Sequence, residues 1–159
     1  MEKLLKIPYT VFNNKWDLLQ KFLERRGNPR YELVGFVDLS FREDIFNLGN
    51  LVRVDGDLQL SWSSIQSLGA LEYVNGHLSL YSTPIQSLGN LKYVGGKLDL
   101  GYSSIQSLGD LEYVGHNLLL FYTPIQSLGN LKYVDIAIWL SENHEIPEDE
   151  LTRFKIKYY

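Results

Sequence analysis

The chain has 159 residues, of which 45% are hydrophobic and 21% are charged, and this balance is typical of one globular domain and not of a disordered chain. The net charge of −4 argues against general nucleic-acid binding, which needs a basic surface to neutralise phosphates. The sequence contains no cysteine, so disulfide bonds and thiolate metal sites are excluded.

The opening stretch MEKLLKIPYTVF lacks the long apolar core and the small-residue cleavage site of a secretory signal. No apolar run in the sequence is long enough to span a bilayer. We therefore expect a cytoplasmic protein that has neither a membrane nor a nucleic acid as its partner.

Residues 1–35 are predicted to form a helical cap at the N-terminus. Asparagines suited to capping precede a stretch with helical spacing, and Gly27 and Pro29 follow it. The apolar side chains of this stretch share one face: Trp16, Leu19, Phe22 and Leu23. Its basic side chains could attract an anionic partner, but a solvated outer face is the simpler interpretation: Lys15, Lys21, Arg25 and Arg26.

Residues 36–146 contain a repeat of 20 residues, in which the phrase IQSLG begins at positions 65, 85, 105 and 125. Each repeat also carries two apolar residues two positions apart, such as Leu78 and Leu80, which is the spacing of inward side chains on a short strand. A unit of this length cannot bury its apolar side chains alone, whereas stacked units can. The sequence therefore predicts a solenoid in which each turn adds one strand to a parallel sheet.

The arrangement resembles the leucine-rich repeat family, whose pattern is L-x-x-L-x-L-x-x-N-x-L. In the stretch NGHLSLYSTPI, Leu78 and Leu80 match the second and third leucines of that pattern, and Ile85 matches its last apolar position. A hydroxyl residue such as Thr83 stands where the family has an asparagine that ties neighbouring turns together. The resemblance implies a right-handed coil with a parallel sheet of about six short strands. Short proteins of this style are also similar to ones in bacterial and bacteriophage genomes.

Residues 147–159 are predicted to form a second helical cap. Pro147 is suited to the start of a helix, and acidic residues follow it in the first turn. Leu151, Phe154 and Tyr158 have the spacing to pack on the last coil. The two caps and the solenoid are expected to form one continuous domain.

The outward positions of the strands differ from repeat to repeat, and we expect the function to reside there. These positions are polar in the first repeats and aromatic in the later ones, and an exposed aromatic patch usually marks an interface. The predicted partner-binding residues are Trp62, Tyr81, Asp99, Tyr102, Leu119, Phe121, Tyr122 and Trp139. Three occupants of this patch remain open: another protein, a second copy of the chain, and the C-terminal tail.

Two further columns recur once per turn. Tyrosines at one position are predicted to stack as a structural ladder, with carbohydrate binding along their rings as the alternative: Tyr73, Tyr93, Tyr113 and Tyr133. In the other column, Asp57 could orient His77 for catalysis near Ser79, although a surface row of charges that includes Lys97 explains it equally well. The histidines are dispersed, so neither a metal nor another cofactor is expected.

Catalysis needs unlike groups that converge on one point, while repeats place like groups in rows. We therefore expect a non-catalytic protein–protein interaction module and not an enzyme. Homodimerisation through the same patch is the alternative, and carbohydrate binding is the third. If the chain is of phage origin, the resemblance suggests steric inhibition of a protein in the host cytoplasm as one use.

Overall fold

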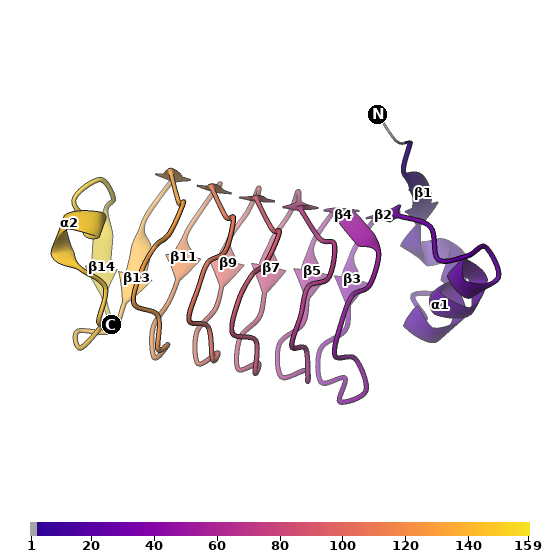
Figure 1. Ribbon diagram of the computed structural model, residues 1–159, viewed down its shortest axis with the longest axis horizontal. Helices are drawn as coiled ribbons and strands as arrows, with labels where there is room; N and C mark the ends of the chain where they lie inside the picture. The colour runs from indigo at the N-terminus through magenta and orange to yellow at the C-terminus, as the bar shows by residue number, and fades with distance from the viewer. Residues whose placement is uncertain (1–2) are drawn as a thin grey trace.

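The computed structural model describes residues 3–159 as an elongated β-solenoid, with α1 near one end and α2 near the other (Figure 1). Two parallel sheets of seven strands each run along its length. In the repeats, neighbouring strands pair in register at a separation of one repeat, as Leu78 does with Leu98. The period of the sequence is therefore the period of the coil.

The first sheet contains, in spatial order, β1 (Leu5–Pro8), β2 (Tyr31–Val34), β4 (Leu51–Asp55), β6 (Tyr73–Val74), β8 (Tyr93–Val94), β10 (Tyr113–Val114) and β12 (Tyr133–Val134). The second sheet contains, from its C-terminal end, β14 (Ile156–Tyr158), β13 (Ile138–Leu140), β11 (Leu118–Leu119), β9 (Leu98–Asp99), β7 (Leu78–Ser79), β5 (Leu58–Gln59) and β3 (Val37–Asp38).

The predicted solenoid with parallel strands is confirmed, and the structure adds a sheet that we did not predict. The predicted strands are those of the second sheet. The first sheet is built in the repeats from a Tyr-Val pair only two residues long, such as Tyr93–Val94. Two residues are too few to show the alternation of a strand, so their regular recurrence suggested stacked side chains without a sheet.

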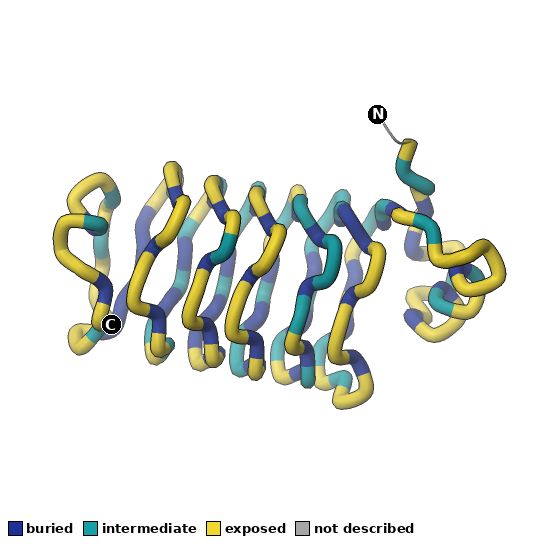
Figure 2. The backbone as a smooth tube through the Cα atoms, viewed as in Figure 1, coloured by how far each residue is buried: buried dark blue, intermediate teal, exposed yellow. Residues whose placement is uncertain are grey.

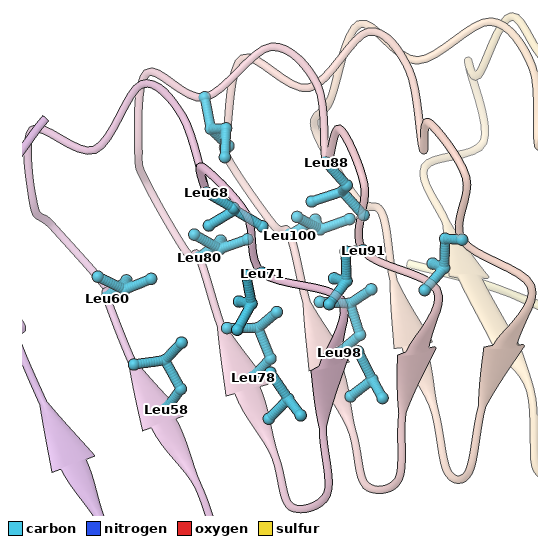
Figure 3. Close-up of a cluster of buried hydrophobic side chains, with 14 of the residues drawn as sticks. Leu58, Leu60, Leu68, Leu71, Leu78, Leu80, Leu88, Leu91, Leu98 and Leu100 are labelled. Carbon is cyan, nitrogen blue, oxygen red and sulfur yellow. The ribbon is translucent and has the colours of Figure 1, made fainter. Parts of the chain in front are cut away.

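The core lies between the two sheets and consists of stacked aliphatic side chains. Leu58, Leu78 and Leu98 point inward from consecutive strands and are fully buried (Figure 3). Leu71 and Leu91 come just before β6 and β8 of the first sheet, and their side chains meet these leucines in the interior. Buried and exposed segments alternate around each coil (Figure 2). Each repeat therefore buries its apolar side chains against the next repeat.

Buried hydroxyl groups close the corners after β5, β7 and β9 of the second sheet. Ser63, Thr83 and Ser103 are at most 4% exposed. Each donates to the carbonyl oxygen three residues earlier, as Thr83 Oγ1 does to Leu80 at 2.8 Å. The asparagine of the leucine-rich repeat pattern ties neighbouring turns together. The hydroxyls of this protein instead stabilise the corner of their own turn.

At the N-terminus, the expected helix is α1 (Trp16–Glu24), which follows the short 3-10 helix η1 (Tyr9–Phe12). Trp16, Leu19 and Leu23 are buried, as the helical spacing predicted. The residue before the helix is Lys15, which makes no capping bond through its side chain, so the expected asparagine cap is wrong. The strands β1 and β2 flank this helical segment.

The C-terminal cap is helical only in part. The helix α2 (Glu148–Leu151) is one turn long, and the chain then forms β14, which extends the second sheet by pairing with β13. A carboxylate oxygen of Glu150 accepts the main-chain N–H of Leu128 at 2.7 Å and fixes this segment to the last repeat. β14 pairs main-chain groups that β13 would otherwise leave open, and it becomes the short last strand of the sheet. Within residues 3–159, no helix has the length and apolar character needed to cross a membrane.

Candidate functional site

Aromatic side chains from successive turns form a continuous row along the corner that follows the second sheet. We call this set the aromatic row, and it consists of Trp62, Tyr81, Tyr102, Phe121, Tyr122 and Tyr159. The ring centres of Trp62 and Tyr81 are 5.5 Å apart, and those of Tyr81 and Tyr102 are 5.4 Å apart. Tyr102 then contacts Tyr122 at 4.8 Å. The row therefore crosses several turns without a break.

Three members of the row combine high exposure with a strained backbone. Trp62, Tyr102 and Tyr122 are 54%, 51% and 50% exposed. Their φ angles are 60°, 57° and 56°, in the left-handed region that suits glycine or asparagine. This conformation costs an ordinary residue about 1–2 kcal/mol. Ser82 has the same conformation at the same corner, with a φ of 53°, so the fold does not require an exposed aromatic ring there.

Phe121 lies across a glycine of the neighbouring turn. A Cβ atom at Gly101 would collide with the Phe121 ring. Gly101 is buried, and the ring of Phe121 is partly exposed above it. The missing side chain therefore lets Phe121 lean along the row toward Tyr102, whose ring centre is 6.1 Å away.

The C-terminal strand covers one end of the predicted patch. Lys157 of β14 pairs in register with Trp139, and its Nζ atom lies 4.9 Å from the centre of a ring of that indole. Tyr159 packs against Phe121 at 5.5 Å and against Tyr122 at 6.1 Å. The tail therefore covers part of Trp139 but extends the aromatic row by one exposed ring.

Leu119 and Asp99 occupy adjacent strands on the outward face of the second sheet and are partly buried. Burial raises the pKa of the Asp99 carboxyl group, against the opposing effects of the Gly101 N–H group and the Lys97 charge. The Oδ1 atom of Asp99 accepts the Gly101 N–H at 3.0 Å. Asp99 therefore supports the backbone beside the row and does not belong to it.

A hollow of about 270 Å³ opens beside Tyr122, between the last repeat and the C-terminal segment. Leu120, Pro124 and Ile125 contribute apolar surface, while His144 and Glu145 lie on its other side. A space of this size next to an exposed ring can accept a side chain of a bound molecule.

The structure thus brings five of the eight predicted binding residues into one row: Trp62, Tyr81, Tyr102, Phe121 and Tyr122. Trp139, Leu119 and Asp99 lie on the strand face beside it, and Trp139 is partly covered. Sequence reasoning missed Tyr159 of the row, and it also missed Phe41, which is not a member of the row but has the same corner conformation. Phe41 is 71% exposed and has the left-handed φ of 60° one turn before Trp62.

The tyrosine column forms a stack on the first sheet. The ring centres of Tyr93 and Tyr113 are 4.7 Å apart, and those of Tyr113 and Tyr133 are 4.9 Å apart, with nearly parallel planes. Arg53 lies over the ring of Tyr73 at 4.7 Å. The inner faces of the stacked rings are occupied by neighbouring rings, which supports a structural ladder over carbohydrate stacking.

The Asp57 and His77 side chains bond to the main chain of the next turn and not to each other. Asp57 Oδ1 accepts the N–H of His77 at 2.7 Å, and His77 Nδ1 accepts the N–H of Lys97 at 2.8 Å. The carboxylate therefore does not orient the imidazole ring in the way that a catalytic pair requires. Within residues 3–159, no group of three or more histidine, aspartate or glutamate side chains is arranged to hold a metal ion.

Together, the coil and the row define a repeat β-solenoid with an exposed aromatic corner. Comparisons of the chain with protein-family models, with curated proteins and with solved structures gave no match.

Proposed function

We propose that the protein is a non-catalytic binding module that recognises another protein through the aromatic row. The observation that carries this proposal is the placement of Trp62, Tyr102 and Tyr122, which are half exposed although their backbone is strained. Tryptophan and tyrosine are enriched among the residues that dominate binding at protein interfaces. Selection for binding is a sufficient reason to keep aromatic residues at corners where the fold also accepts a serine, as at Ser82.

The hollow beside Tyr122 supports a protein partner. Interface energy concentrates where an anchor side chain enters a pocket next to aromatic residues. The row supplies the flat aromatic surface, and the hollow of about 270 Å³ supplies the pocket. The continuous core makes the surface rigid, so we infer a steric action in which the bound partner is masked or held.

The leucine-rich repeat relationship is part of the same proposal. It is supported by the inward leucine pairs and by the parallel strands that they form. Members of repeat families present extended surfaces for binding, and this protein has its variable residues along such a surface. The difference at the hydroxyl corner, where Thr83 bonds within its own turn, counts against a close relationship.

Self-association through the row is the alternative that the experiment must separate. Two copies could bury their rows against each other in a symmetric contact. The molar mass of the wild-type protein alone is first measured by light scattering at several concentrations. A stable dimer that the variant Trp62→Ser/Tyr102→Ser converts to a monomer would replace the binding proposal with self-association.

Partner binding is tested by affinity capture from cells that make the protein, followed by reconstitution with the purified captured protein. We expect a monomer whose complex is lost in Trp62→Ser/Tyr102→Ser. The matched control is Phe36→Ser/Phe46→Ser, since these phenylalanines are 56% and 52% exposed but lie outside the row. Equal binding by the row variant and the control variant would overturn the proposal.

A further inference from the structure

A second hollow, of about 380 Å³, lies on the outward side of the second sheet and is lined by groups that can donate hydrogen bonds. Its lining residues are Gln59, His77, Leu78, Ser79, Lys97 and His116. His77, Ser79 and Tyr81 occupy alternate positions of one strand segment, so the hollow is on the same face as the aromatic row but at the other end of the strands. We call it the donor hollow.

The backbone fixes which nitrogen of His77 carries the proton. The N–H group of Lys97 donates to His77 Nδ1 at 2.8 Å, so Nδ1 must keep its lone pair. In the neutral ring the proton is therefore on Nε2, which makes Nε2 a hydrogen-bond donor. His77 is thus held by the fold with its donor nitrogen available.

His116 reaches His77 across the intervening turn because that turn carries a glycine. The two imidazole rings are in edge contact, with centres 6.5 Å apart. A Cβ atom at Gly96 would collide with the His77 ring. The glycine therefore leaves space for two imidazoles from different turns to lie together at the hollow.

One ammonium group lines the hollow, and two carboxylates lie near it. Lys97 lines it, and among the ion pairs of residues 3–159 none involves its ammonium group. Two carboxylates face this region, Asp57 and Asp99, and each already accepts a main-chain N–H, from His77 and Gly101 respectively. Their charge weakens anion binding without removing the donors, so a modest affinity is expected.

A transition metal is the other ligand that two histidines suggest, and the hydrogen bonds argue against it. A metal binds the lone pair of an imidazole nitrogen. In His77 the Nδ1 lone pair is used by Lys97 and Nε2 carries the proton, so metal binding would first have to break a hydrogen bond of the fold. Protonated donors beside an ammonium group match an oxyanion instead.

We propose that the donor hollow is a binding site for a small oxyanion, a phosphate or a carboxylate group. Lys97 supplies the charge, while His77 Nε2 and His116 supply directional hydrogen bonds, with Gln59 at the edge. The site requires no protein partner, so it stands or fails independently of the proposed function.

The test uses the full chain, with inorganic phosphate and acetate as separate probes at fixed pH and constant ionic strength. The imidazole proton–carbon NMR signals of His77 and His116 are expected to shift saturably with at least one probe. His144 is an internal control, since it lies in the C-terminal segment, where its Nδ1 accepts the Ile146 N–H at 3.2 Å. Tighter binding of phosphate or of acetate would identify which group the site prefers.

Three variants make the result specific. Lys97→Met keeps the main-chain N–H that holds His77 and removes the charge, and it should weaken binding by about 5- to 10-fold. Lys132→Met, on the surface of another turn, should leave the affinity unchanged, and Asp99→Asn should increase it. Shifts that stay linear, that include His144 equally, or that persist unchanged in Lys97→Met would overturn the proposal.

Discussion

The Nζ atom of Lys157 lies 4.9 Å from the centre of a Trp139 indole ring, because the two residues pair in register on β14 and β13. An ammonium group over an indole face is a cation–π contact. It gives the last strand a side-chain attachment in addition to its hydrogen bonds. It also makes Trp139 part of the C-terminal cap, which shifts the open aromatic surface toward Trp62 and Tyr102.

A double-mutant cycle measures this attachment. Lys157→Met, Trp139→Leu and the double variant should give a coupling free energy of about 0.5–1 kcal/mol in urea unfolding. The control is Lys155→Met, which lies just before the strand and should show no coupling to Trp139→Leu. A coupling of zero in the first cycle would mean that the two side chains are merely adjacent.

The strained corner predicts a substitution that stabilises the protein. Phe41 has a φ of 60° and is 71% exposed, so its side chain contributes little burial while its backbone is strained. Phe41→Gly should raise the free energy of unfolding by about 0.5–1 kcal/mol, since glycine adopts this conformation without a steric penalty. Thermal and urea unfolding give the change directly.

Phe46 is the matched control for this substitution. It is 52% exposed in the same turn and is not among the residues with positive φ. Phe46→Gly should therefore lower stability by about 0.5–1 kcal/mol through the flexibility that glycine adds to the unfolded chain. If both glycine variants change stability in the same direction, backbone strain at Phe41 is not the cause.

The hydroxyl corners predict unequal effects for two adjacent serines. Ser103 is 3% exposed and its Oγ donates to the Leu100 carbonyl at 2.6 Å, whereas Ser104 is exposed. Ser103→Ala should lower the free energy of unfolding by about 1 kcal/mol, the typical net value of one hydrogen bond. Ser104→Ala should change it by less than about 0.5 kcal/mol. Equal effects of the two variants would contradict a structural role for the buried hydroxyl.

Much of the coil could be predicted because its repeats are almost identical. Leu78 and Leu80 recur with the same spacing in each turn, and identical turns can stack only with equivalent residues in register. The first sheet was missed because Tyr93–Val94 is too short to show a period. The last strand was missed because the helical spacing of Leu151 and Phe154 gives no information about the free edge that β13 would otherwise leave.

The candidate site was predictable only where it follows the repeat. Trp62, Tyr102 and Tyr122 stand at the same corner of their turns. Phe41 is 21 positions before Trp62 because its corner is one residue longer, so a strict 20-residue comparison places Arg42 there instead. Tyr159 lies outside the repeats, and its contact with Phe121 depends on how the tail folds back.

The buried carboxyl group of Asp99 predicts that the free energy of unfolding falls as the pH rises. Burial raises the pKa of its carboxyl group in the folded protein, so the folded state binds more protons than the unfolded state between the ordinary and the raised pKa. Stability is therefore lost as the pH rises through this window. Asp99→Asn removes the charge and keeps an oxygen that can accept the Gly101 N–H.

We expect Asp99→Asn to be more stable than the wild type at pH 7 and equally stable near pH 3, where the carboxyl group of the wild type is protonated in both states. Urea unfolding of the two proteins at several pH values measures this difference. Asp110→Asn, on an exposed corner, should show no such trend. A variant that is less stable than the wild type at pH 7 would mean that the charged bond to Gly101 outweighs the cost of burying Asp99.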